Sequence, residues 1–156
     1  MKSKFGYFIL FLFFGFVASA QNLSKSCPRN FDAKALAAFK KKPEKLQESI
    51  VSFDAVVRRI EKGYNDRPYF EVGFESGETL WVASMMSEQS ITIGQKIRIL
   101  GYIGRVEKDD EIGMQYNKKG LQIRAFAILD TTTKQLSFSD AFESEAKIWK
   151  SGSIPK

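Results

Sequence analysis

The sequence contains no histidine among its 156 residues. Histidine titrates closest to neutral pH, serves as the base in Ser-His and Cys-His catalysis, and is the commonest metal ligand in proteins. The sequence also has neither the G-x-x-x-x-G-K-[ST] pattern that cradles phosphates nor the dinucleotide-binding pattern G-x-G-x-x-G. These absences predict a protein that is not an enzyme and that has no catalytic residues, no cofactor and no metal site.

Cysteine is nearly absent as well, because Cys27 is the single cysteine of the chain. One thiol cannot form a disulfide within the chain, so the fold must be stabilised by its hydrophobic core. Cys27 lies close to the expected mature N-terminus. The sequence leaves open whether it is a free thiol or forms an intermolecular disulfide with another chain.

Two short patterns resemble catalytic or metal motifs but are incomplete. Ser144 and Lys147 fit S-x-x-K, yet the companion S-D-N and K-T-G elements are missing. The acidic run 109–111 lacks the spaced ligands of a calcium-binding loop. Both patterns are therefore expected to be ordinary solvated surface.

The N-terminus has the three parts of a secretory signal peptide. Lys2 and Lys4 are followed by an uncharged apolar run over 5–17 and by A-S-A at 18–20. This order predicts cleavage after residue 20 and export to the periplasm or the extracellular space. The alternative is an uncleaved anchor, but a membrane-spanning helix needs about 20 apolar residues and this run is shorter. No membrane span is expected after cleavage.

The charge of the chain is only mildly positive. The formal net charge is +6, and removal of Lys2 and Lys4 leaves 22 basic and 18 acidic residues, a net charge of +4. Such a balance either favours anionic partners such as nucleic acid, lipid headgroups and acidic glycans, or simply maintains solubility. The lysine run 40–42 has the same two interpretations, a polyanion-binding surface or a solvated helix face.

The hydrophobic pattern predicts one domain. Residues 21–33 are expected to form a flexible leader, 34–150 a single domain and 151–156 a tail. Apolar residues recur at helical spacing between 31 and 49, with an interruption at Pro43, and again after Asp140, where Glu143 completes a capping box. Between these helices, alternation with a period of two predicts five strands, over 50–61, 69–75, 78–83, 96–106 and 121–129. A glycine in the middle of the fourth strand, Gly101, predicts a bulge or a sharp bend there.

This order resembles a known family. The segments 38–57 and 93–102 are similar to the bacterial exported OB domains of the tRNA-anticodon-binding-like type, which place a short helix before the first strand and a glycine in the fourth. The resemblance covers 34–129 and implies a mainly β fold, a five-stranded OB-like barrel with a short N-terminal helix and a C-terminal helix. It also implies a binding function and supplies no catalytic residue.

Ligands of OB folds lie on the face of strands two and three. Tyr69 and Trp81 alternate with core residues there and could stack on the rings of an oligosaccharide, a peptide or a nucleic acid, while Arg58 and Arg98 could contact anions. The carboxylates of Glu71 and Glu75 on this hairpin make nucleic acid the less favoured ligand. Alternatively, both aromatic rings pack beneath a helix or beneath the polar excursion 107–120. The protein would then be a structural or protein-interaction component of the cell envelope.

Overall fold

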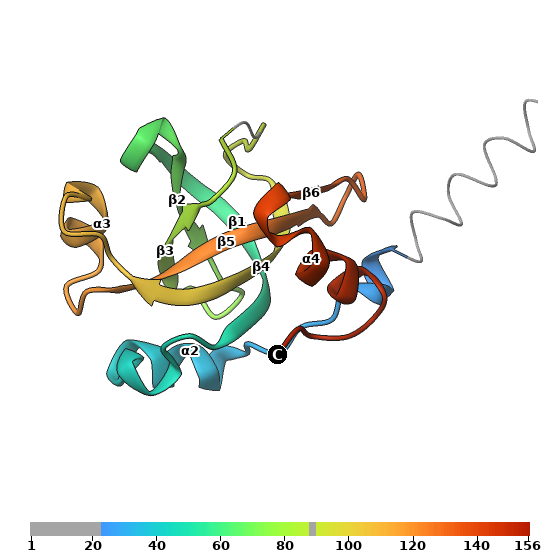
Figure 1. Ribbon diagram of the computed structural model, residues 1–156, viewed down its shortest axis with the longest axis horizontal. Coiled ribbons are helices and arrows are strands. Elements are labelled where there is room, and N and C mark those ends of the chain that lie inside the picture. The colour runs from blue at the N-terminus through green and yellow to red at the C-terminus, as the bar shows by residue number, and fades with distance from the viewer. Residues whose placement is uncertain (1–22, 88–89) are drawn as a thin grey trace, which may run out of the picture.

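The computed structural model describes residues 23–87 and 90–156 of the chain (Figure 1). The predicted signal peptide 1–20 lies outside the described residues. The elements follow in the order α2 (Ala33–Lys41), η1 (Pro43–Leu46), β1 (Ile50–Lys62), η2 (Tyr64–Asp66), β2 (Pro68–Gly73), β3 (Thr79–Ser84), β4 (Lys96–Arg105), α3 (Glu111–Tyr116), β5 (Leu121–Asp130), β6 (Leu136–Phe138), η3 (Asp140–Phe142) and α4 (Glu143–Lys150).

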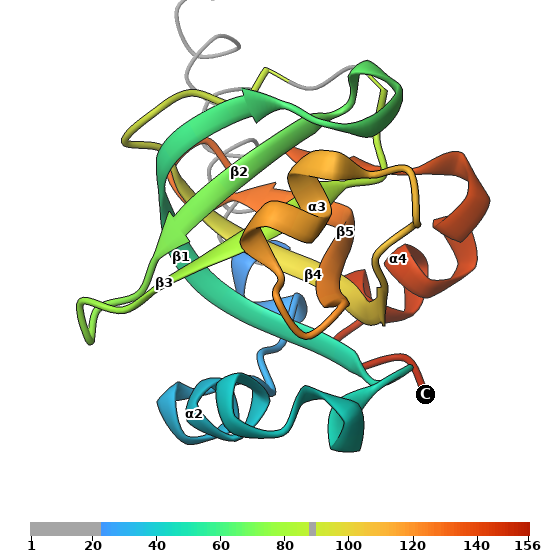
Figure 2. The same cartoon turned by 90° about the vertical axis from the view of Figure 1, so that its left-hand side faces the viewer.

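Five strands close into a barrel (Figures 1 and 2). The long first strand β1 pairs with β4 through its first half and with β2 through its second half, both antiparallel. The β2–β3 hairpin and the β4–β5 pair are also antiparallel, and a short parallel pairing of β3 with β5 closes the ring. This is the strand order of an OB barrel, and the predicted fold class is confirmed.

The fourth and fifth strands are irregular where the sequence predicted it. The register between them shifts at Gly101, but the extra residue is Phe126 on β5 rather than a residue of β4. A Cβ atom placed on Gly101 would lie 2.6 Å from the carbonyl oxygen of Arg124. The backbone of β5 therefore occupies the space that a side chain would need. Glycine is needed here for close approach of two strands.

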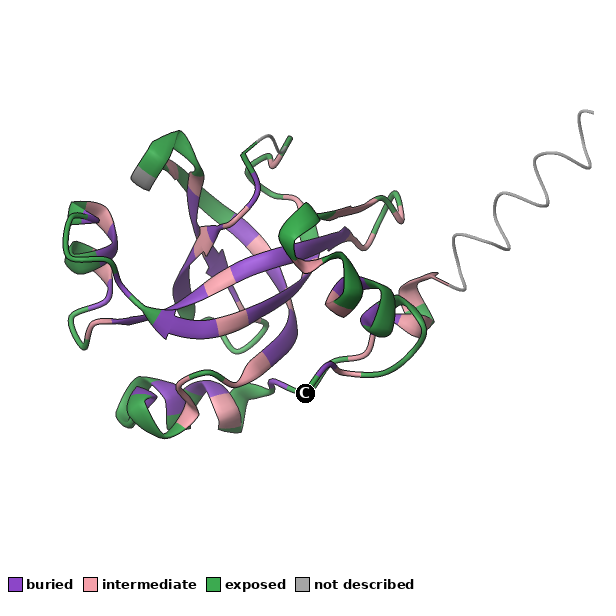
Figure 3. Ribbon diagram, in the orientation of Figure 1, coloured by how far each residue is buried: buried purple, intermediate pink, exposed green. Residues whose placement is uncertain are grey.

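The barrel interior holds the main core (Figure 3). Alternation correctly places Phe70 and Val72 of β2 and Leu80 and Val82 of β3 inside the barrel. Helix α2 covers one end, because Leu36 and Phe39 lie three residues apart on one helix face and join the same cluster; the other buried members of the cluster are Phe31, Val51, Phe53, Ala55, Val57, Met86, Ile97, Ile99, Ile103, Leu121, Ile123, Ala125 and Ile128.

The N-terminal segment departs from the expected flexible leader over its described part. Residues 23–26 form a helical turn, and Cys27 is completely buried (0% exposed) in a second hydrophobic cluster on the outside of β4 and β5. The Trp149 indole of α4 belongs to the same cluster and donates a hydrogen bond to the Pro28 carbonyl at 2.8 Å. The outer face of β4 and β5 carries apolar residues of its own, and α4 together with this segment excludes water from them.

This burial also corrects the idea of an intermolecular disulfide. Because the Cys27 sulfur is enclosed, it is not available to another chain in this conformation, and burial raises the pKa of the thiol. The predicted capping box is not formed either. Asp140 lies in η3, and α4 begins at Glu143 without a side-chain hydrogen bond from its N-cap residue Phe142. Among the described residues, no helix is long and apolar enough to cross a membrane.

Candidate ligand-binding site

The outer face of the β2–β3 hairpin carries the predicted aromatic pair. Tyr69 and Trp81 lie on the same face and stack with ring centroids 5.6 Å apart. A third ring, Tyr116 of α3, lies on Trp81 at 3.9 Å with an interplanar angle of 12°. The Tyr69 and Trp81 side chains are only 1% and 8% exposed. The excursion 107–120 therefore covers the aromatic pair, as the alternative interpretation of the sequence allowed.

Hydrogen bonds hold α3 on this face. The Tyr116 hydroxyl donates to Glu61 at 2.7 Å, and the Tyr69 hydroxyl donates to Gln122 at 2.7 Å while accepting from the Asn117 amide. Burial raises the pKa of Tyr69 far above its usual value of 10.0, so the phenol stays protonated and available as a donor. The N-cap residue of the helix is Asp110, whose carboxylate accepts from the Gly113 amide at 2.7 Å.

The arginine beside the aromatic rings is Arg59 rather than Arg58. A bulge in β1 between Val57 and Arg59 leaves Arg58 without a partner residue on β2. The Arg59 guanidinium lies 5.0 Å from the Trp81 ring centroid and forms an ion pair with Glu71 at 2.8 Å. The hydrogen bond from Arg59 lowers the pKa of Glu71. Strict alternation missed this arrangement, because a bulge inverts the faces of the residues that follow it.

Arg58 and Arg98 lie together, but away from the rings. Both line an open cavity of about 490 Å³ that Tyr69 and Trp81 do not line. The Arg58 side chain lies across Gly73, so a Cβ atom added to this glycine would be 2.6 Å from Arg58 Nε.

Arg98 has a structural role. Its side chain is only 12% exposed and makes two hydrogen bonds to Asp54, at 2.6 and 3.0 Å. It also donates to the carbonyls of Ser24 and Cys27, at 2.8 and 2.6 Å. The two bonds to carbonyls tie the N-terminal segment to the barrel, and all four together leave the guanidinium little capacity for a ligand.

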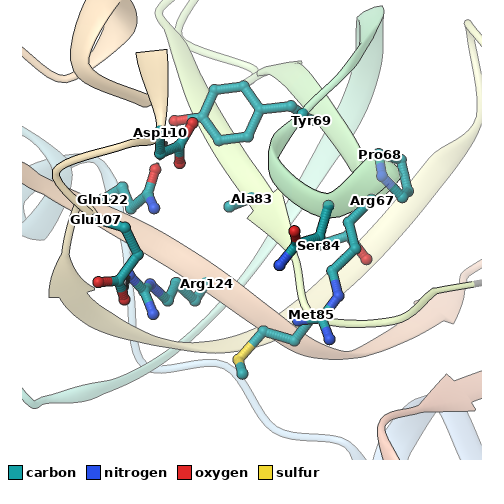
Figure 4. A pocket seen from close by; sticks show the side chains of 12 residues that line it. Arg67, Pro68, Tyr69, Ala83, Ser84, Met85, Glu107, Asp110, Gln122 and Arg124 are labelled. Atoms are coloured by element: carbon teal, nitrogen blue, oxygen red, sulfur yellow. Dashed lines mark hydrogen bonds and ion pairs between the residues drawn. The ribbon is translucent and has the colours of Figure 1, made fainter. Parts of the chain in front are cut away.

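A second cavity, of about 240 Å³, lies between the β1–β2 connection, the end of β3 and the start of the excursion (Figure 4). Tyr69 is the one predicted site residue that lines it. Figure 4 shows Arg124 and Glu107 on one side and Arg67 and Pro68 on the other. The full lining consists of Gly63, Asn65, Arg67, Pro68, Tyr69, Ala83, Ser84, Met85, Glu107, Asp110, Gln122 and Arg124.

Two arginines, Arg124 and Arg67, line this cavity. Arg124 forms an ion pair with Glu107 at 2.8 Å and donates to the Arg105 carbonyl, while its buried Nε has no acceptor among the described residues. Burial alone would lower the pKa of Arg124, but its hydrogen bonds raise it, so the guanidinium stays charged. Arg67 is exposed, and its side chain forms no ion pair with any residue of 23–87 or 90–156.

Sequence reasoning missed this cavity, although a signal for it exists. Gln122 and Arg124 occupy the outward positions at the start of β5, between the inward residues Leu121, Ile123 and Ala125. Two polar residues on the outer side of an otherwise apolar strand mark a surface that something polar must contact. Their partners come from the excursion and from β2, so the sequence pattern of β5 alone does not identify them.

The near-motifs do not assemble into a chemical site. The Ser144 hydroxyl donates to Glu145 at 2.6 Å, whereas Lys147 forms an ion pair with Glu143 at 2.7 Å. The two members of the S-x-x-K pattern thus bond to different carboxylates and not to each other. Within the described part of the chain, no three acidic or cysteine side chains lie close enough together to hold a metal ion.

Comparison with known proteins gives likeness of fold only. No family model and no curated protein matches the chain. One similar solved structure is named as an aspartyl-tRNA synthetase from Leishmania major Friedlin, with a TM-score of 0.41, 12% identity, and coverage of 58% of this chain and 19% of that one.

Another is a Replication Protein A heterotrimer bound to ssDNA, with a TM-score of 0.36, 14% identity, and coverage of 61% of each chain. This chain thus spans about a fifth of the first structure's length and less than two thirds of the second's. At this level of similarity neither structure carries a function across. The strand pairing itself, with β1 shared between β2 and β4 and with β3 closing on β5, assigns the chain to the OB fold.

Proposed function

We propose that this protein is an exported, non-enzymatic binding module that holds one unit of an oligosaccharide in the cavity between Arg67 and Arg124. The observation that carries the proposal is the position of these two cations. They face one cavity from the β1–β2 connection and from β5, next to the connection between β4 and β5. The loops between strands one and two and between strands four and five are those that OB folds use to contact oligomers.

The size and chemistry of the cavity favour this ligand class. A volume of about 240 Å³ is below the range of roughly 300–1,000 Å³ for drug-sized ligands, so it suits one ring of a longer chain. Arg67 and Arg124 supply donors, which calls for a ligand rich in hydroxyl or carboxylate oxygens. Glu107 and Asp110 line the same space and would repel closely spaced phosphates. An oligosaccharide fits better than nucleic acid.

The absence of catalysis is part of the proposal. Each carboxylate of the cavity already has a structural partner, since Asp110 caps α3 and Glu107 pairs with Arg124. Neither is positioned as a free general base, and the chain contains no histidine to replace them. A binding role needs only the donors and the cavity.

A second candidate function rests on a different observation. Tyr116 covers Trp81, so the face on which an OB ligand would stack is occupied by the chain's own α3. This favours a structural or protein-interaction component of the envelope without a polymer ligand.

A binding titration separates the two candidates. Protein would be titrated with panels of neutral and acidic oligosaccharides, peptides and single-stranded nucleic acid at low and high salt. Arg67→Ala should weaken oligosaccharide binding about five- to tenfold, because it removes a charged hydrogen-bond donor. Arg58→Ala is the matched control, because it removes an exposed arginine from the other cavity.

Each outcome is decisive. Loss of binding in Arg58→Ala but not in Arg67→Ala would move the site to the larger cavity. Absence of binding to every panel would favour the interaction component. A preference for nucleic acid that falls steeply with salt would replace the oligosaccharide assignment.

A further inference from the structure

Six exposed lysines gather where α2 meets the turn after α3. We call this surface the lysine corner; it consists of Lys40, Lys41, Lys42, Lys45, Lys118 and Lys119. The two contributing segments are far apart in sequence and are held together by Lys119, whose ammonium donates to the carbonyls of Lys40 and Lys41 at 3.2 and 2.5 Å. Figure 2 shows the turn after α3 reaching toward α2.

The positive charge of the corner is poorly compensated. Among the described residues, Lys40 is its one member with a carboxylate partner, Glu78 at 3.1 Å. Glu44 and Glu48 lie in or next to η1, but neither forms an ion pair within that part of the chain. Like charges held together destabilise the compact state, so the fold retains here a concentration of charge that its own acidic residues do not neutralise.

The composition of the corner points to a particular partner. Single-stranded nucleic acid is held in grooves by stacking on aromatic rings, and phosphates are recognised with bidentate geometry by arginine. The lysine corner contains no arginine and no aromatic residue, and none of its lysines lines either of the two cavities described above. Lysines are point charges on long stems, and clusters of about four to eight of them bind the diffuse charge of anionic lipid headgroups.

We propose that the lysine corner docks the domain on an anionic lipid bilayer. The interaction is electrostatic and peripheral, so it depends on the fraction of anionic lipid and weakens as salt rises. It goes beyond the proposed oligosaccharide site and does not depend on it, because the cavity between Arg67 and Arg124 shares no residue with the corner.

Vesicle binding tests the proposal. The full chain would be sedimented with vesicles of phosphatidylcholine alone and of equal parts phosphatidylcholine and phosphatidylglycerol, at low and high salt. The test variant combines Lys41→Gln, Lys42→Gln, Lys45→Gln and Lys118→Gln and leaves the contact between α2 and the turn after α3 intact. The matched control combines Lys108→Gln, Lys147→Gln, Lys150→Gln and Lys156→Gln. These lysines are exposed elsewhere on the surface, and their replacement lowers the net charge by the same amount. Residues 1–22 are identical in all three proteins, so differences between them report on the lysines.

The anionic vesicles should bind the unchanged protein more tightly than phosphatidylcholine does, and high salt should abolish the difference. Binding should fall roughly fivefold for each corner lysine removed, while the control falls much less. An equal loss in both variants would overturn the proposal, since net charge alone would then explain the binding. So would absence of any preference for anionic vesicles, or displacement from them by an oligonucleotide that binds the protein more tightly at the same salt.

Discussion

Tyr116 lies on the indole of Trp81 with their ring centroids 3.9 Å apart, and its hydroxyl donates a hydrogen bond to Glu61 of β1. A residue of the excursion thus occupies the place on the hairpin where an OB ligand would stack. The contact attaches a six-residue helix, too short to be stable alone, to the outside of the barrel.

Removal of this ring should therefore destabilise the protein and expose Trp81. Tyr116→Ala is expected to lower the free energy of unfolding by about 1–3 kcal/mol, from lost stacking and lost burial. Urea unfolding measures the change, and the tryptophan fluorescence of the folded variant should shift to longer wavelength. Met114→Ala is the control, because Met114 is exposed on the same helix. Equal stability of Tyr116→Ala and the parent would show that α3 does not depend on this contact.

Arg98 should control access to Cys27. Arg98→Ala removes the hydrogen bonds to the Ser24 and Cys27 carbonyls, so the N-terminal segment should detach and expose the buried thiol. Alkylation of Cys27 should be slow in the parent and at least tenfold faster in this variant. Arg29→Ala provides the control, since Arg29 also pairs with Asp54 but is largely exposed. Similar rates in all three proteins would mean that the segment opens without breaking the Arg98 contacts.

Gly101 should tolerate no side chain. In Gly101→Ala the new Cβ would meet backbone of β5 at 2.6 Å, which cannot move without breaking the strand pairing, and a loss of about 1–3 kcal/mol is expected. Gly73→Ala offers a matched comparison, because its Cβ would meet only the movable Arg58 side chain at the same distance. Thermal unfolding of the two variants should differ clearly. A melting temperature for Gly101→Ala equal to that of Gly73→Ala would refute the close approach of β4 and β5.

The Arg59–Glu71 ion pair should contribute to acid sensitivity. Because Arg59 lowers the pKa of Glu71 below 4.5 in the folded protein, its stabilisation is fully present above the unfolded value. It is lost as pH falls through the folded-state pKa. Glu71→Gln should therefore be less stable than the parent at neutral pH, and the difference should narrow in acid. Unfolding free energies at a series of pH values measure this, and a gap that is constant with pH would contradict it.

Export remains a prediction from residues 1–20. N-terminal sequencing of the protein released by its producing cell should begin at Gln21. Retention of the apolar run 5–17 in a membrane fraction would show an anchor instead.

The barrel could be predicted from the sequence because the patterns that indicate it lie within single strands and hairpins. Alternation in the hairpin correctly placed Phe70 and Val82 inside, and the mid-strand glycine correctly located the irregularity between β4 and β5. In β1, however, the bulge at Arg58 exchanged the roles of two adjacent arginines. A bulge depends on the partner strand, so a periodic pattern read along a single strand cannot place it.

The candidate site was harder, because it depends on contacts between distant segments. The excursion is polar, yet Tyr116 reaches Trp81, 35 positions earlier, and Asn117 reaches Tyr69. The N-terminal segment carries too few apolar residues to predict packing, and its burial depends mainly on Arg98 and Trp149. Long-range contacts of this kind become visible only once the chain is folded.

The junction of Arg98, Pro28 and Trp149 has a mechanical consequence. The chain enters the fold through the carbonyls of Ser24, Cys27 and Pro28, and these are held by one residue of β4 and one of α4. A pulling force on the segment before residue 23 would therefore reach this junction first and load its hydrogen bonds. The domain should yield by releasing its two terminal segments at a lower tension than the barrel strands can withstand, so that the barrel and its cavities stay intact while the tether lengthens.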